Sequence, residues 1–281
     1  MEAILFVGHG SKDPEGNEEL KQFTQRMAAQ LDAEMVETCF LEFASPDIPE
    51  GIDICVARGA KKITLVPMML FAAGHAKVHI PFAIYEAKEK YPDIEFTYKR
   101  AIEVDEVVLE IMKKRLREIQ PQIHKDTAVL VVGRGSSDKY ANSDLYKVAR
   151  LFWEETDVRW VEVAFMGVTE PLFHEGMERC IRLGAKKIIV LPYFLFTGVL
   201  IKRMERFTKE FQEKYPHIQM AMSAYLGMDD ELMPVFEQRL REENPGEGWT
   251  WEKLAEQALA QGLDHHHHHH HDHHHDHHHH H

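Results

Sequence analysis

An internal repeat with a constant offset of 125 residues limits the folds open to this chain more than any other feature of its sequence. VGHGS at 7–11 returns as VGRGS at 132–136. GAKKITLVPMMLF at 59–71 returns as GAKKIIVLPYFLF at 184–196. Such self-similarity at a fixed spacing is typical of duplicated structural units. The sequence therefore predicts two tandem copies of one domain.

Within each copy, short apolar runs alternate with amphipathic segments. The first run, AILFVG, is continuously apolar, as expected for a parallel strand buried on both faces. Strands alternating with helices predict the α/β class. We expect two flavodoxin-like or Rossmann-like domains, each a parallel sheet of about four strands. If the strand order is the flavodoxin-like 2-1-3-4, the first three strands are neighbours. In the first copy we predict strands at 3–8, 34–43, 61–70 and 93–100, and helices at 17–31, 50–59, about 75–90 and 105–119.

The repeat also suggests the domain boundaries. KYPDI at 90–94 and KYPHI at 214–218 are offset by 124 rather than 125, so the register slips by one residue before them. We assign four segments: an N-terminal domain with the metal site (1–119), a linker (120–127), a C-terminal repeat domain with a degenerate site (128–245), and a tail that ends in a disordered, His-rich segment (246–281).

The ends of the first three predicted strands carry three polar side chains: His9, Glu42 and His75. In open α/β sheets, ligands bind beyond the carboxyl ends of the strands, where the strand order reverses. Two imidazoles and a carboxylate suit Fe, Co, Ni or Zn, and the same groups transfer protons near neutral pH. A single histidine in a turn is more often structural, and His79, four residues after His75, is either an accessory ligand or a packing residue.

The second copy favours a functional interpretation. It retains the glycines, prolines and apolar runs, but Arg134 takes the place of His9, and Gly167 and Leu200 take the places of Glu42 and His75. Residues that the fold requires should recur in both copies, whereas one active site needs its residues only once. We therefore place a metal site in the first copy.

Composition excludes several other classes. The chain has 33 Lys and Arg against 46 Asp and Glu, a net charge of −13 that argues against nonspecific nucleic-acid binding. Its longest apolar run, 188–201, is too short to cross a bilayer, and no secretory signal is visible. The three cysteines form no CxxC pair, and neither GHGSKD nor GRGSSD completes a dinucleotide-binding motif. We expect a cytoplasmic protein that binds no nucleotide.

Fifteen His and two Asp make up residues 265–281. The two Asp interruptions favour a native metal-binding tail over a cloning tag, and a segment without apolar residues is expected to be disordered. Such a tail would hold Co, Ni, Zn or Cu loosely. The predicted auxiliary ligands span it: His265, His271, His273, His277 and His281.

The segments FVGHGS, ETCFLEF and GAKKITLVPMMLFAAGHAKVHIP, in tandem arrangement, resemble the class II chelatases of tetrapyrrole synthesis over about residues 1–245. The resemblance implies insertion of Co²⁺, or alternatively Fe²⁺ or Ni²⁺, into sirohydrochlorin without ATP. Cobalt would serve cobalamin biosynthesis, and iron would serve sirohaem. The resemblance further implies that His9 and His75 bind the metal and take part in proton removal, with Glu42 assisting. A noncatalytic metal store remains the alternative.

Further expectations follow from this resemblance. Some long members carry a cysteine-rich motif before a His-rich tail; this chain has no such cysteines, so we expect no iron–sulfur cluster. Two halves in one chain replace a dimer, which predicts a monomer. A polycarboxylate substrate requires local cations in an acidic protein. The candidate substrate-binding residues, whose alternative role is ordinary solvated surface, are Ser11, Lys12, Lys77, Arg134, Lys202 and Arg203.

Overall fold

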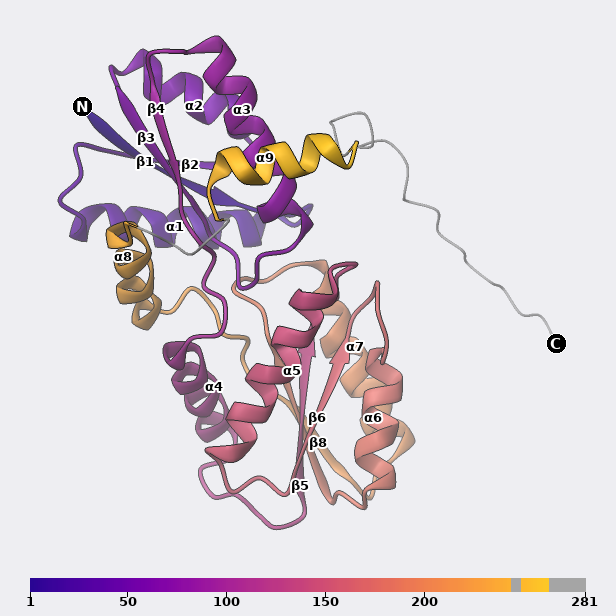
Figure 1. Cartoon of the computed structure of the whole chain (residues 1–281). Coiled ribbons are helices and arrows are strands. Elements are labelled where there is room, and N and C mark those ends of the chain that lie inside the picture. The colour runs from indigo at the N-terminus through magenta and orange to yellow at the C-terminus, as the bar shows by residue number, and fades with distance from the viewer. Residues whose placement is uncertain (244–248, 263–281) are drawn as a thin grey trace.

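The computed structural model describes residues 1–243 and 249–262, apart from the side chain of His75 (Figure 1). Its two halves each contain a four-stranded parallel sheet. The first sheet has the order β2-β1-β3-β4 and the second the order β6-β5-β7-β8, which confirms the predicted topology and the α/β class. The strands are β1 (Glu2–Gly8), β2 (Met35–Phe40), β3 (Lys62–Pro67), β4 (Glu95–Tyr98), β5 (Thr127–Gly133), β6 (Trp160–Phe165), β7 (Lys187–Pro192) and β8 (Gln219–Met222).

Helices connect the strands, and aspartates begin several of them. The side chains of Asp13, Asp47, Asp105 and Asp138 each accept a hydrogen bond from a backbone N–H of the first turn of their helix. Such caps satisfy donors that the helix itself leaves unpaired. The helices are α1 (Pro14–Gln30), α2 (Ile48–Ala57), the π-helix η1 (His75–His79), α3 (Ile80–Lys90), α4 (Glu106–Ile119), α5 (Lys139–Glu154), α6 (Phe173–Arg182), α7 (Val199–Lys214), the short 3₁₀ turn η2 (Asp230–Leu232), α8 (Met233–Arg241) and α9 (Trp251–Ala260).

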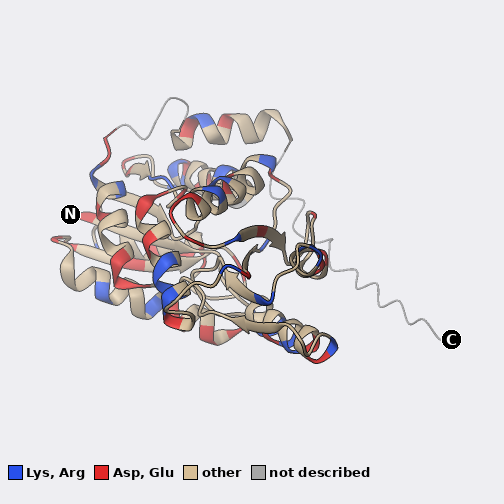
Figure 2. Ribbon diagram, turned by 90° about the horizontal axis from the view of Figure 1, so that it is seen from below, with Lys and Arg blue, Asp and Glu red and all other residues tan. Residues whose placement is uncertain are grey.

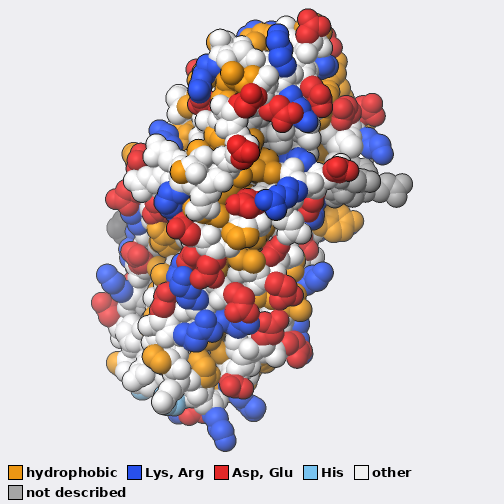
Figure 3. All heavy atoms as spheres, turned by 90° about the vertical axis from the view of Figure 1, so that its left-hand side faces the viewer, with side chains coloured by type: hydrophobic (Ala, Val, Ile, Leu, Met, Phe, Trp, Pro, Cys, Tyr) orange, Lys and Arg blue, Asp and Glu red, His pale blue; other side chains and the backbone are white. Residues whose placement is uncertain are grey.

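Basic and acidic residues alternate over the ribbons of both halves (Figure 2). The face in Figure 3 likewise carries charged side chains of both signs, with apolar atoms scattered among them.

Across residues 1–243 and 249–262, every helix is too short or too polar to cross a membrane.

The last helix of each half packs on the other half. Helix α4 follows β4 but lies against α5 and β7 of the second half. Helix α8 follows β8 but returns to β3, and its Phe236 packs edge-on against Phe23 of α1, with 5.9 Å between ring centroids. Figure 1 shows this exchange, with α4 beside α5 and α8 beside α1. The boundaries at residues 119 and 128 separate the two copies along the sequence. In space, each half also contains one helix from the other copy.

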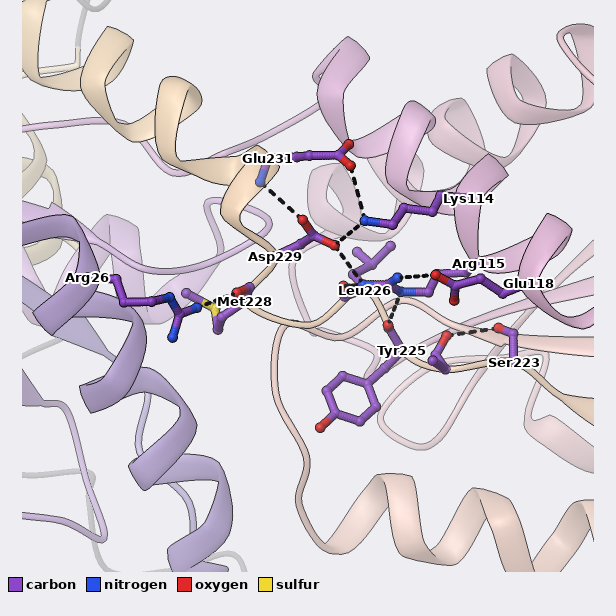
Figure 4. Close-up of polar contacts among 11 residues, drawn as sticks. Arg26, Lys114, Arg115, Glu118, Ser223, Tyr225, Leu226, Met228, Asp229 and Glu231 are labelled. Carbon is purple, nitrogen blue, oxygen red and sulfur yellow. Dashed lines mark hydrogen bonds and ion pairs between the residues drawn. The ribbon is translucent and has the colours of Figure 1, made fainter. Parts of the chain in front are cut away.

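Each exchanged helix has one arginine that binds the chain segment leading to the other exchanged helix. Arg115 of α4 donates hydrogen bonds to the carbonyl oxygens of Tyr225 and Leu226, at 2.9 and 2.8 Å, and pairs with Asp229 at 3.0 Å (Figure 4). Lys114 also pairs with Asp229, at 2.9 Å. The crossing segment after β8 is thus fixed to α4 by charge-assisted hydrogen bonds, which are stronger than neutral ones.

Arg239 of α8 makes the equivalent contacts in the other direction. Its guanidinium donates to the carbonyl oxygens of Ala101 and Ile102, at 3.1 and 2.7 Å, and lies 3.4 Å from a carboxylate oxygen of Asp105. The residue is 3% exposed. Arg239 also pairs with Glu242 at 3.1 Å. Its loss would therefore leave the two carbonyls without this donor and both carboxylates without this cation.

We expect Arg239→Ala to lower the free energy of unfolding by about 3 to 5 kcal/mol, as is typical when one partner of a buried ion pair is removed. Guanidinium denaturation measures the loss. Arg241→Ala, on the same helix but with a side chain 81% exposed, is the matched control and should change little. Equal stabilities for the two variants would show that the crossing contact does not hold the halves together.

Helix α9 belongs to the first half, although it follows the second half in sequence. It lies along α3 and η1, and Leu254 joins the core formed by the first sheet (Figure 1). The predicted tail, 246–281, therefore includes a segment that is part of the fold. Packing explains the difference, because Trp251 and Leu254 bury apolar surface that a tail would leave in water.

Candidate metal and substrate site

Two glycines present His9 at the end of β1. A Cβ atom on Gly8 would lie 2.1 Å from Cδ2 of Leu20, so this position lets the strand end pack closely against α1. Gly10 has φ of 90°, and a Cβ atom there would lie 1.7 Å from the carbonyl oxygen of Glu42. Only glycine fits at position 10, where φ is positive and the obstructing atom belongs to the backbone. The turn that holds His9 is thereby pressed against the backbone of Glu42.

This close approach brings two of the three predicted site residues together. The backbone N–H of Glu42 donates to the carbonyl oxygen of His9 at 3.1 Å. Their side chains also meet, with 3.5 Å between Nε2 of His9 and Oε1 of Glu42. His75 begins η1, and its side chain lies outside the described part of the structure. In the described residues, no three His, Cys, Asp or Glu side chains form a group that would hold a metal.

The second half contributes Arg134 to the same place. Its Nη1 lies 2.8 Å from Nε2 of His9, and Nδ1 of His9 lies 3.1 Å from the carbonyl oxygen of Gly10. A guanidinium only donates and a carbonyl only accepts, so Nδ1 carries the proton and Nε2 is the acceptor. In this tautomer the free lone pair is on Nε2, the atom that faces Glu42 and Arg134. A metal ligand needs a free lone pair directed into the site.

The pKa of His9 is lowered from 6.5 to about 4, mainly by burial and next by the charge of Arg134. The hydrogen bond to the Gly10 carbonyl raises the pKa in part, and the charge of His79 has the smallest lowering effect. A buried site disfavours the imidazolium because it loses hydration there. His9 is therefore neutral at pH 7, the form that binds metal ions.

This low pKa of His9 predicts a pH dependence of stability. Between pH 6.5 and 4 the unfolded chain binds a proton at His9 that the folded chain does not, so stability should fall as the pH is lowered through this window. Relative to His9→Gln, the wild type should lose about 3 kcal/mol across it. Parallel urea denaturations of both proteins at pH 7, 5.5 and 4.5 measure this difference. A difference that stays constant with pH would contradict the lowered pKa.

Two of the predicted substrate-binding lysines form a reciprocal pair of contacts between the halves. Nζ of Lys77 lies 2.6 Å from a carboxylate oxygen of Asp138, and Nζ of Lys202 lies 2.6 Å from one of Asp13. Each lysine is at the repeat position of the other, and each aspartate caps the first helix of the opposite half. These lysines join the two halves beside the site.

The other candidates lie on the loops and helices around His9. The Ser11 hydroxyl accepts a hydrogen bond from the backbone N–H of Asp13 at 3.0 Å, which shapes the turn before α1. Lys12 lies over the ring of Phe43, with 5.2 Å from its Nζ to the ring centroid. Arg203 follows Lys202 in α7 and is half-buried.

Sequence reasoning missed two exposed apolar residues at the site. Phe43 directly follows Glu42, and Val168 directly follows Gly167, the equivalent position in the second half. They have φ of 62° and 68° and are 54% and 74% exposed. A bulky or β-branched residue at positive φ is strained, and such strain is concentrated at functional sites. The sequence signal that could have revealed them is an apolar residue at both of these positions, which are 125 residues apart.

The one-residue slip of the repeat lies in the helix that carries His75. The backbone N–H groups of Lys77 and Lys202 donate to the carbonyls of Ala73 and Gly198, so both copies start this helix at equivalent positions. Both copies end it before an equivalent tyrosine. The first copy contains one more residue and accommodates it as the π-helix η1, whereas α7 is a regular α-helix. Single π turns inside α-helices frequently mark functional sites.

Comparisons with known proteins agree with this geometry. The CbiX family model matches residues 3–119 and again 128–243. The chain is 52% identical over 251 residues to a sirohydrochlorin cobaltochelatase of Priestia megaterium, covering 88% of this chain and 81% of that protein. It is 35% identical to a sirohydrochlorin ferrochelatase of the same organism, covering 86% and 90%.

Solved structures show the same likeness. SirB from Bacillus subtilis with Fe³⁺ has a TM-score of 0.75 at 32% identity, and the match covers 86% of this chain and 94% of that one. The sirohydrochlorin chelatase SirB from Bacillus subtilis subspecies spizizenii in complex with cobalt has a TM-score of 0.73 at 30% identity, covering 92% and 97%. With a site of neutral imidazole and carboxylate at the strand ends of the first repeat, this chain belongs to the CbiX family of chelatases.

Proposed function

We propose that this chain is a sirohydrochlorin cobaltochelatase, which inserts Co²⁺ into sirohydrochlorin without ATP. The observation that carries the proposal is its 52% identity, over 88% of the chain, to a protein of that name. The alternative substrate metal, iron, has weaker support, because the ferrochelatase of the same organism is 35% identical.

In the proposed reaction, His9 and His75 hold Co²⁺ while two pyrrole N–H protons leave the ring. Neutral Nε2 of His9 is the ligand atom, and Nδ1–H remains bonded to the Gly10 carbonyl. Glu42, with Oε1 at 3.5 Å from Nε2, accepts one pyrrole proton, and Nε2 of His9 accepts the other once the metal has passed from it to the ring. Arg134 donates to the same Nε2 atom, so it has to leave His9 before the metal binds there.

The proposed substrate explains how Arg134 leaves. Sirohydrochlorin is a polycarboxylate, and a guanidinium binds carboxylates in a bidentate geometry that an imidazole cannot offer. Arg134 is exposed enough to turn from His9 to a substrate carboxylate. Lys12 and Arg203 are further carboxylate contacts, Ser11 shapes the loop, and Phe43 and Val168 pack against the ring. Lys77 and Lys202 would reach the substrate only by leaving their aspartate partners.

This mechanism predicts opposite effects for Arg134→Ala on the two substrates. Without the guanidinium, Nε2 of His9 is open, so Co²⁺ should bind the free protein more tightly, by about 3- to 10-fold for one lost hydrogen bond. Sirohydrochlorin should bind more weakly, with a higher KM and a smaller change in kcat. Isothermal titration with Co²⁺ and steady-state kinetics measure both effects. If both affinities fell together, Arg134 would have only a structural role.

We further propose a monomeric, cytoplasmic enzyme. Each exchanged helix covers the sheet of the other half within the chain, which leaves no need for a second copy. The three cysteines are free and buried, as in proteins of a reducing compartment. The proposed auxiliary metal ligands of the tail, His265 to His281, lie outside the described residues.

The visible spectrum tests the proposal directly. Sirohydrochlorin mixed with Co²⁺ and catalytic amounts of the chain should change to the spectrum of the cobalt product many times faster than without protein. The same experiment with Fe²⁺ under anaerobic conditions should be slower. A rate equal to the uncatalysed one with both metals would instead support a noncatalytic metal store.

A further inference from the structure

Helix α9 covers the open edge of the first sheet beside the π-helix. The indole Nε1–H of Trp251 donates to the carbonyl oxygen of Phe96, in the edge strand β4, at 3.0 Å. Leu254 packs into the core below, and the helix contacts both α3 and η1. This contact satisfies an edge-strand carbonyl and joins α9 to the helix that carries His75.

A second set of contacts reaches the backbone of η1 itself. The hydroxyl of Tyr98, at the end of β4, donates to the carbonyl oxygen of Ala76 at 2.5 Å. Tyr98 is 3% exposed, and burial raises its pKa well above the ordinary value, so the hydroxyl stays protonated and donates. The ring of Trp249 stacks on Tyr98, with centroids 5.8 Å apart, and covers its ring. The carbonyl that Tyr98 holds belongs to the residue directly after His75.

The equivalent place in the second half is an open hollow. By the offset of 124 that holds after the slip, Met220 and Met222 stand where Phe96 and Tyr98 stand in the first half. They line a surface hollow of about 340 Å³ between α7 and β8, together with polar residues of α7 such as Thr208 and Gln212. Methionine at the Tyr98 position cannot donate a hydrogen bond to the helix. Among residues 1–243 and 249–262, the second half therefore has neither the π turn, nor the tyrosine, nor a covering helix.

We propose that Tyr98 and α9 are positioning elements that hold the π-helix η1 and thereby fix the metal ligand His75. The proposal rests on the proposed function of His75. An α-helix with one extra residue can place that residue in more than one turn, and each placement turns His75 in a different direction. The hydrogen bond to Ala76 and the packing of α9 select one placement. Groups that orient a metal ligand commonly change metal affinity 10- to 100-fold when lost.

The Tyr98→Phe variant tests the hydrogen bond while keeping the ring that stacks on Trp249. We expect the dissociation constant for Co²⁺, measured without sirohydrochlorin, to rise about 10-fold. The KM for Co²⁺ should rise with it, whereas the KM for sirohydrochlorin should stay unchanged. Met222→Leu, at the equivalent position of the second half, is the matched control and should leave all three constants as in the wild type. An unchanged Co²⁺ dissociation constant for Tyr98→Phe would overturn the role of the tyrosine.

Two shortened chains test α9 separately. A chain ending at Gly262 keeps α9, and a chain ending at residue 248 loses Trp249 and α9; both lack the His-rich tail. We expect the shorter chain to bind Co²⁺ about 10-fold more weakly than the longer one, and to give an altered visible absorption of bound Co²⁺. Equal affinities and spectra would overturn the proposal. These measurements need no sirohydrochlorin, so a wild type that inserts no cobalt would refute the proposed function and leave the comparison of the two chains decisive.

Discussion

Replacement of His9 by alanine should reduce kcat/KM for cobalt insertion by about 10²- to 10⁴-fold, the range usual for loss of a group that acts in proton transfer or holds the reacting metal. The side chain is half-buried at the strand ends, and its Nε2 atom faces Glu42. Alanine leaves no lone pair there. The variant should keep the fold, because Gly8 and Gly10, rather than the imidazole, set the course of the turn.

The control for this variant is His217→Ala, which removes an exposed histidine of the second half. It should insert cobalt at the wild-type rate. Initial rates from the visible spectrum, together with melting temperatures of both variants, separate chemistry from folding. Normal insertion by His9→Ala would place the active site elsewhere in the chain.

A chain ending at Gly262 should keep its full rate when Co²⁺ is plentiful and lose about 10-fold when free Co²⁺ is buffered to a low concentration. The fifteen histidines of 265–281 are predicted from the sequence to bind metal loosely, which would raise its local concentration without orienting a macrocycle. Retained ions shorten the search for metal only when metal is scarce.

Initial rates against buffered free Co²⁺, for the full chain and the shortened one, measure this effect. A full-length chain in which the tail histidines are replaced by serine is the control for tail length. Loss of the rate at saturating Co²⁺ would make the tail a source of an essential ligand, and identical curves at every concentration would make it inert.

The repeat and the strand pattern were enough to predict the sheets and the meeting of His9 with Glu42. Parallel strands end at one edge of a sheet, so residues that follow neighbouring strands have to lie close together. The absence of both residues from the second copy led to the prediction that the first copy carries the metal site. This part of the site follows from strand order alone.

The helix exchange could not be predicted in the same way. Apolar periodicity shows that 105–119 buries one face, but it does not show which sheet receives that face. The charges raised a similar difficulty, because Lys77 and Lys202 look like free cations in the sequence, and only the structure pairs them with Asp138 and Asp13. The register slip before KYPDI was visible, yet an extra residue fits a loop as easily as a π turn.

The exchange of α4 and α8 has a consequence for how such a gene can change. A duplicated enzyme whose second copy has lost its ligands would ordinarily be free to lose that copy. Here deletion of the second half would remove α8, which covers the first sheet, and would leave α4 with no sheet to cover. The fold alone would therefore retain the second half even if its repeat of the site held no metal, and positions such as Arg134, Gly167 and Leu200 could then change to suit the substrate.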